Sequence, residues 1–188
     1  MRVEAPKKLF SVDEYYRMAE AGILGPEDRV ELIDGEIIEM SPIGARHLGC
    51  VNRVNELFTE VFRARAVVSP QNPVRLSNYT EPEPDIALLK FRPDFYASKT
   101  PAAEDALLLL EVSDTTLQYD RDVKLPRYAA AGIPEVWIAN LQEDLLLVCR
   151  DPSPDGYKTC VTLAQGAIVS VAAFPEITFR AKDLLGFA

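Results

Sequence analysis

Two carboxylates in this chain stand beside segments with the apolar character of buried strands. Asp85 precedes the apolar run 86–89, and Glu111 follows the apolar run 106–110. A charge at the end of a buried strand is costly unless it is paired or binds a cation. Mg²⁺ prefers a few carboxylates, a backbone oxygen and water. Asp85 and Glu111 therefore indicate a cation site, with the carbonyl of Val112 as a candidate third ligand.

A basic side chain follows the second carboxylate. Lys124 lies in a predicted helix, and Tyr128 lies four residues later on the same helix face. Hydrolysis of a phosphodiester requires an activated water, neutralisation of transition-state charge and a stabilised leaving oxygen. Cations held by carboxylates supply much of this, and a nearby lysine can polarise the water or the phosphate. Asp85, Glu111 and Lys124 together indicate a metal-dependent phosphodiesterase.

Each of these residues also has an ordinary structural explanation. Asp85 follows a proline, and Pro-Asp pairs are frequent in turns. Glu111 could be a strand-end charge that reaches solvent. Lys124 and Asp120 could form an ordinary pair on an exposed helix surface. Spacing alone leaves both interpretations open.

Three further side chains are candidates for the same site. His47 is the only histidine, and its place on a predicted apolar helix stripe makes it either a half-buried core residue or a metal or phosphate contact. Glu31, in a predicted strand, either joins the site or faces solvent. Ser113 lies two residues after Glu111 and hence on the same strand face, although 113–116 also has the composition of a turn.

Periodicity and turn residues predict the elements that must position these side chains. Ser11 and Glu14 form a capping box that starts a short helix, and Gly22 with Gly25-Pro26 ends it. Asp34-Gly35 predicts a two-residue hairpin. The other predicted elements are a helix over 45–65, strands at 67–68, 74–76, 86–89 and 106–112, a helix over 120–131 closed by Gly132, and strands at 135–139, 145–149, 157–163, 168–171 and 177–180.

A proline limits where the second long helix begins. Proline fits the first turn of a helix but removes a hydrogen bond from its interior. A start at Asp122 places Pro126 near the first turn, whereas an earlier start implies a kink. The element order predicts a mixed α/β (α+β) fold for a single domain, 1–188, with a central sheet flanked by helices and extra antiparallel C-terminal strands.

The composition is that of an acidic globular protein. The chain has 188 residues, 48% hydrophobic and 26% charged, with a formal net charge of −9. This balance counts against a protein whose main task is to coat nucleic acid, because that affinity comes from Lys and Arg on phosphates. It does not exclude a nuclease, because acidic metal ligands add negative charge and a bound ion reverses the local field.

Cysteine usage and the N-terminus predict the compartment. The three cysteines, Cys50, Cys149 and Cys160, form no CxxC pair. We therefore expect small apolar thiols in a reducing cytoplasm, without a zinc site or a disulfide framework. Residues 1–8 contain no apolar signal segment, and no apolar run approaches the roughly 18 residues that span a bilayer. The expectation is a cytoplasmic protein without membrane contact.

Taken together, these motifs resemble the PD-(D/E)XK nuclease superfamily, and most closely its Uma-two branch of restriction-endonuclease-like proteins. The resemblance covers roughly 11–140 and adds little over the C-terminal strands. The matching pieces are 30–36, 40–42 with His47, Pro84-Asp85, 111–113, 120–124 with Tyr128, 132–133 and 136–138.

The resemblance implies a restriction-endonuclease-like core and Mg²⁺-dependent cleavage of DNA, with Mn²⁺ able to substitute. It maps Asp85 and Glu111 onto the acidic metal ligands. The lysine of the superfamily normally lies two residues after the second acid, where this chain has Ser113. Lys124, on the next helix, looks like the migrated lysine. Glu31 and His47 look like auxiliary site residues.

Three functions remain open after this comparison. The first is an endodeoxyribonuclease, the second a catalytically silent binding or scaffold module with the same fold, and the third a metal-dependent phosphodiesterase acting on RNA or another substrate. Related nucleases often act as symmetric dimers, because two sites are needed to cut both strands. With the apolar C-terminal strands, this predicts a homodimer.

Overall fold

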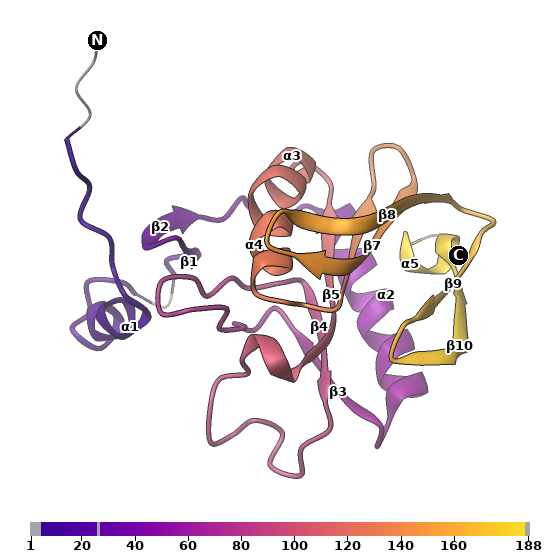
Figure 1. Ribbon diagram of the computed structural model, residues 1–188, viewed down its shortest axis with the longest axis horizontal. Coiled ribbons are helices and arrows are strands. Elements are labelled where there is room, and N and C mark those ends of the chain that lie inside the picture. Colours follow the sequence, from indigo (N-terminus) through magenta and orange to yellow (C-terminus); the bar gives the residue numbers. More distant parts are fainter. Residues whose placement is uncertain (1–4, 26, 187–188) are drawn as a thin grey trace.

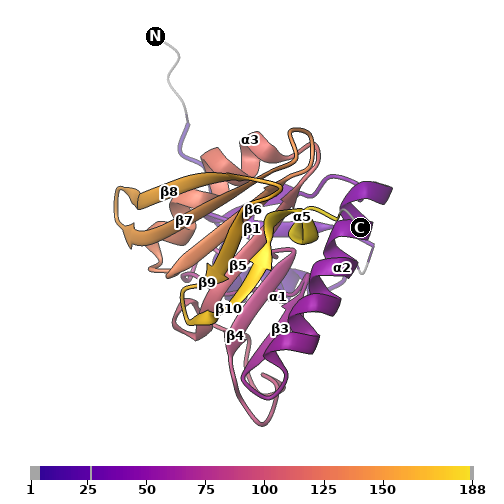
Figure 2. The same ribbon diagram turned by 90° about the vertical axis from the view of Figure 1, so that its right-hand side faces the viewer.

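The fold is built on a six-stranded sheet in the order β3-β4-β5-β6-β7-β8 (Figures 1 and 2). The computed structural model describes residues 5–25 and 27–186. β5 and β6 are parallel and the other neighbours are antiparallel, which confirms the predicted mixed sheet. The strands are β3 (Ala66–Pro70), β4 (Ile86–Lys90), β5 (Ala106–Ser113), β6 (Glu135–Asn140), β7 (Leu145–Ser153) and β8 (Gly156–Ala164).

Apolar layers cover both faces of the central strands. On one face Phe58 of α2 (Ala45–Phe62) packs in a buried cluster with Leu110 and Trp137. On the other face Tyr128 of α4 (Leu125–Ala130) belongs to a second buried cluster with Leu109. Figure 1 shows α2 and α4 on opposite sides of the sheet. Burial on both faces explains why β5 is a continuous apolar run rather than an alternating one.

A helix and a hairpin precede this sheet. The helix α1 (Val12–Glu20) starts with the predicted capping box, in which Glu14 N–H donates to Ser11 Oγ and Ser11 N–H donates to the Glu14 carboxylate. The strands β1 (Val30–Ile33) and β2 (Glu36–Glu39) are antiparallel. Asp34 and Gly35 both have positive φ, at 51° and 78°, which is the type I′ turn that the sequence predicts. Pro26, placed in the predicted helix stop, and residues 1–4 of the N-terminal segment lie outside the described residues.

The strand predicted at 74–76 is wrong. Arg75 N–H donates to the Pro101 carbonyl and Val74 N–H donates to the Pro82 carbonyl, so the segment pairs with loops and forms only isolated bridges. Neighbouring prolines explain the difference, because proline cannot donate to a ladder. The loop that follows β4 ends in the short 3₁₀ helix η1 (Ala103–Asp105).

The helix predicted over 120–131 begins earlier than its proline suggests. It runs through α3 (Leu117–Tyr119), a π-helical turn η2 (Asp120–Lys124) and α4. Pro126 therefore lies inside a longer helical segment, and the irregularity is a π turn. Gly132, at a φ of 78°, closes the segment as predicted.

The C-terminal strands divide between two antiparallel arrangements. β8 extends the main sheet by pairing with β7, whereas β9 (Ile168–Val171) and β10 (Phe174–Arg180) form a separate two-stranded sheet before α5 (Ala181–Leu184). Cys149 and Cys160 face each other in the β7–β8 register and form a disulfide. The expectation of three free thiols is therefore wrong, because strand pairing joins cysteines that no sequence motif links. Cys50 is free and buried.

No helix in the described part of the chain is long and apolar enough to cross a membrane.

Candidate active site

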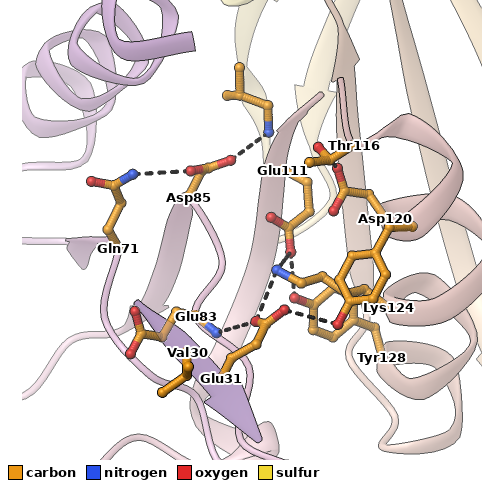
Figure 3. A network of polar contacts seen from close by, with 12 residues as sticks. Val30, Glu31, Gln71, Glu83, Asp85, Glu111, Thr116, Asp120, Lys124 and Tyr128 are labelled. Atoms are coloured by element: carbon orange, nitrogen blue, oxygen red, sulfur yellow. Dashed lines mark hydrogen bonds and ion pairs between the residues drawn. The ribbon is translucent and has the colours of Figure 1, made fainter. Parts of the chain in front are cut away.

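A cleft of about 670 Å³ opens where β4 begins and β5 ends. The hairpin, the loop before α2, the start of α2 and the π turn all contribute to its walls. Asp85, Glu111, Lys124, Glu31 and His47 line it, so the structure gathers these predicted site residues from distant parts of the sequence. Figure 3 shows Lys124 between the carboxylates of Glu111 and Glu31, with Asp85 nearby, just before the neighbouring strand β4.

Asp85 is held by three groups from different elements. Its Oδ2 accepts a hydrogen bond from Val112 N–H at 2.8 Å and lies 3.0 Å from His47 Nε2. Its Oδ1 accepts from Gln71 Nε2 at 3.2 Å. Asp85 directly precedes β4, whose Ile86 pairs with Leu110, so Asp85 lies beside the end of β5. This carboxylate is fixed in the cleft wall and is more than a turn residue.

Glu111 is buried at the end of β5, with 3% of its surface exposed. Tyr128 OH donates to its Oε1 at 2.5 Å, and Lys124 Nζ lies 3.3 Å from the same oxygen. Burial raises the pKa of Glu111 to about 8, and Lys124 opposes that rise. The interpretation of Glu111 as a solvent-reaching charge is excluded by this burial.

Lys124 is enclosed by acidic groups. Its Nζ lies 3.3 Å from Glu111 and 3.2 Å from Glu31 Oε2. Burial lowers the pKa of Lys124, but the carboxylates of Glu111 and Glu31 outweigh burial, so the net pKa is raised. Lys124 and Asp120 are both buried, so the interpretation as an exposed surface pair is wrong. Lys124 is held as an ammonium group.

Glu31 enters the site from the hairpin. It is buried, and its carboxylate accepts hydrogen bonds from Glu83 N–H and Tyr119 OH, both at 3.1 Å. The solvent-facing alternative for Glu31 is therefore wrong. Burial is the main cause that raises the pKa of the neighbouring Glu83, and the charge of Glu31 adds to it. The hairpin thus supplies Glu31, the second of the two carboxylates that pair with Lys124.

Ser113 contacts the site indirectly. Its Oγ donates to Asp120 Oδ2 at 2.7 Å. Burial raises the pKa of Asp120, and Lys124 counteracts that rise. Sequence reasoning missed both Asp120 and Gln71 as site residues. Asp120 lies four residues before Lys124, a spacing that puts both on one helix face, but the sequence does not show that this face is buried. Nothing in the sequence marks Gln71.

The side chains fit a hydrated Mg²⁺ better than a metal enclosed by protein ligands. In residues 5–25 and 27–186, no three or more His, Cys, Asp or Glu side chains form a metal-binding group. Mg²⁺ usually keeps several waters and binds one or two carboxylates, which Asp85 and Glu111 supply. Asp85 Oδ1 accepts from Gln71, and a carboxylate oxygen can take a second partner. Carboxylate, carbonyl and water oxygens suit Mg²⁺ and Mn²⁺ better than zinc.

The cleft is strongly acidic. Eight Asp or Glu side chains line it, against Arg29 and Lys124 as basic ones. Because phosphate groups are repelled by such a surface, an anionic substrate needs bound cations to enter.

Comparisons with known proteins agree with this architecture. The Uma2 family model, described as "Putative restriction endonuclease", matches residues 12–182. The chain is also similar to a crystal structure described as "a putative nuclease belonging to DUF820 from Anabaena variabilis ATCC 29413", with a TM-score of 0.72 and 16% identity over 94% of this chain and 97% of that chain. At this identity, the likeness shows a shared fold. No curated protein matches the chain.

Proposed function

This chain belongs to the Uma2 family, and on that premise we propose that it is a Mg²⁺-dependent endodeoxyribonuclease that hydrolyses DNA phosphodiester bonds. One observation carries the proposal. Asp85 and Glu111 lie at the adjoining ends of two neighbouring strands, and Lys124 Nζ lies 3.3 Å from Glu111 inside the cleft. Two acids can hold the ion of a metal-assisted hydrolysis, and a lysine beside them can polarise the water or the phosphate.

Asp85, Glu111 and the carbonyl of Val112 would hold the ion. When bound, Mg²⁺ neutralises phosphate charge and makes a water a better nucleophile. Val112 N–H and His47 fix the Asp85 carboxylate, which limits its reorientation. Tyr128 fixes the Glu111 carboxylate in the same way. A site already oriented in this way avoids reorganisation during the reaction.

Lys124 orients the nucleophile in this proposal. Its ammonium group is held between Glu111 and Glu31, where it can donate to a water or a phosphate oxygen. The raised pKa of Lys124 makes it a poor proton acceptor, so its role is electrostatic rather than that of a general base. If the chain is instead a catalytically silent module, neither the native protein nor any Lys124 variant cleaves a substrate.

A cleavage panel tests the proposal. Purified protein is incubated with supercoiled duplex DNA, single-stranded DNA and RNA, with Mg²⁺, Mn²⁺ or a chelator. We expect duplex cleavage that requires the cation and is lost in Glu111→Ala and Lys124→Ala. Loss of one interaction in a unit that works together typically removes orders of magnitude in rate. Cleavage of RNA alone would redirect the substrate class, and no cleavage of any substrate would support the silent module.

We also propose a homodimer. Val161 of β8 and Ile168 of β9 expose 47% and 58% of their surfaces, which leaves apolar area near the C-terminal end of the chain. A symmetric dimer would present two sites to the two strands of a duplex. Light scattering that gives the mass of one chain at assay concentration would contradict this.

A further inference from the structure

Lys124 reaches the site from an element that the central sheet does not position directly. Glu111 belongs to β5, whereas Lys124 ends the π turn that follows α3. A long, flexible lysine side chain on a separate helix needs its backbone fixed before its amine can remain between two carboxylates. The contacts that attach this helix to β5 therefore decide where the amine lies.

Asp120 makes that attachment. Its Oδ2 accepts hydrogen bonds from Ser113 Oγ at 2.7 Å and from Thr116 Oγ1 at 2.6 Å. Ser113 is the last residue of β5, and Thr116 directly precedes α3. Asp120 and Ser113 are buried, at 4% and 0% exposure, so water does not compete for this contact. Hydrogen bonds to a buried carboxylate are among the stronger ones in proteins.

The attachment falls at the first residue of the π turn. Leu125 N–H donates to the Asp120 carbonyl, a bond that spans five residues rather than four. Residues four apart lie about 40° apart around an ordinary α-helix and so share a face, and this also holds for the first and last residues of the wider turn. Here Asp120 and Lys124, the first and last residues of the turn, are both buried. Asp122 between them is exposed and pairs with Arg121.

We propose that Asp120 is a positioning residue for Lys124: by clamping the π turn to Ser113 and Thr116, it holds the Lys124 amine between Glu111 and Glu31. The catalytic meaning of this clamp rests on the proposed function, but the clamp itself does not. The first test therefore measures how accessible the Lys124 amine is to a reagent, without any substrate.

The first test measures how fast an amine-acylating reagent modifies each lysine, by mass spectrometry. In the native chain Lys124 is expected to react far more slowly than the exposed Lys90 and Lys158. In Asp120→Ala, acylation of Lys124 should rise about tenfold or more, because two hydrogen bonds to a charged acceptor are lost. Asp122→Ala is the matched control, since it removes an exposed carboxylate from the same turn and should leave Lys124 protected.

General unfolding is separated from a local effect in two ways. Fluorescence of Trp137, the only tryptophan and fully buried, reports the core, and Lys90 and Lys158 should react at unchanged rates.

Thr116→Val removes one hydroxyl donor at a partly exposed position and should give a smaller rise in the acylation of Lys124. Thr116→Ser keeps the hydroxyl and should restore protection. Equal protection of Lys124 in Asp120→Ala and the native chain would overturn the proposal.

Kinetics give a second reading if the chain cleaves DNA. Asp120→Asn should lower kcat while KM stays close to its native value, because a misplaced amine affects the transition state more than substrate binding. Raised acylation of Lys124 without any nuclease activity would leave the clamp supported and the proposed function contradicted. Unchanged acylation of Lys124 in Asp120→Ala, together with nuclease activity, would contradict the clamp and leave the proposed function supported.

Discussion

Opposing electrostatic effects act on the carboxyl group of Glu111. It is buried at the end of β5, beside a buried ammonium and a buried phenol. Desolvation opposes its ionisation, and the Lys124 charge and the Tyr128 hydroxyl favour it. A carboxylate in this setting is poised between two protonation states, which is typical of functional sites.

The raised pKa of Glu111 predicts that the free energy of unfolding of the metal-free protein depends on pH. The folded-state pKa of Glu111 is raised from 4.5 to about 8, so the folded state binds its proton more tightly than the unfolded state. The resulting stability is fully present below pH 4.5 and is lost as pH rises through about 8. Thermal unfolding with a chelator should show native protein losing more stability over this range than Glu111→Gln. Parallel pH curves for the two proteins would contradict the assignment.

At the scale of the element, the hairpin β1–β2 positions one carboxylate of the site. It delivers Glu31 to Lys124, and its turn depends on Gly35. A Cβ at Gly35 would stand 2.7 Å from the Leu9 Cβ, at a φ of 78° that side chains avoid. Both the contact and the backbone conformation therefore require glycine here.

Two glycine substitutions of opposite sign test this view. Gly35→Ala should lower the free energy of unfolding by more than about 1 kcal/mol, because the new side chain is strained and crowded. Gly49→Ala, in the exposed interior of α2 with nothing within 4 Å of the new Cβ, should raise it by about 0.5–1 kcal/mol. Urea unfolding measures both. A stabilising Gly35→Ala would contradict the turn assignment.

The sequence predicts those elements whose signals are local. The capping box at Ser11, the Asp34-Gly35 turn and the apolar run of β5 all appear as expected. The segment 74–76 has strand composition, but its hydrogen bonds go to loops that only the tertiary structure brings near. The acids and the lysine were predictable by type. Asp120 was missed, because the burial of the helix face that it shares with Lys124 and its contact with Ser113 come from the tertiary structure.

At the scale of the whole molecule, a disulfide links the last two strands of the six-stranded sheet. Cys149 in β7 and Cys160 in the edge strand β8 are bonded, and Cys50 remains a buried thiol. Burial raises the pKa of Cys50 to about 12, so it is protonated and unreactive near neutral pH. The redox conditions during expression and purification decide whether the disulfide between β7 and β8 forms.

Thiol counting checks this state. Native protein purified without reductant should react with a thiol reagent at no cysteine, because Cys50 is buried. The same protein in denaturant should show one thiol, and three after reduction, since Cys149 and Cys160 are then released. Three thiols in denatured, unreduced protein would show that the β7–β8 disulfide does not form. That result would also favour the reducing cytoplasm expected from the sequence.

A calorimetric titration of Mn²⁺ into the metal-free native chain, Asp85→Ala and Asp155→Ala tests whether Asp85 and Glu111 form a cation site. Asp155 is an exposed carboxylate in the turn between β7 and β8 and serves as the matched control. Circular dichroism and Trp137 fluorescence confirm that all three proteins are folded. We expect saturable binding by the native chain and Asp155→Ala and its loss in Asp85→Ala. Equal binding by Asp85→Ala, or no binding by the native chain with or without a DNA duplex, would contradict a cation site at Asp85 and Glu111.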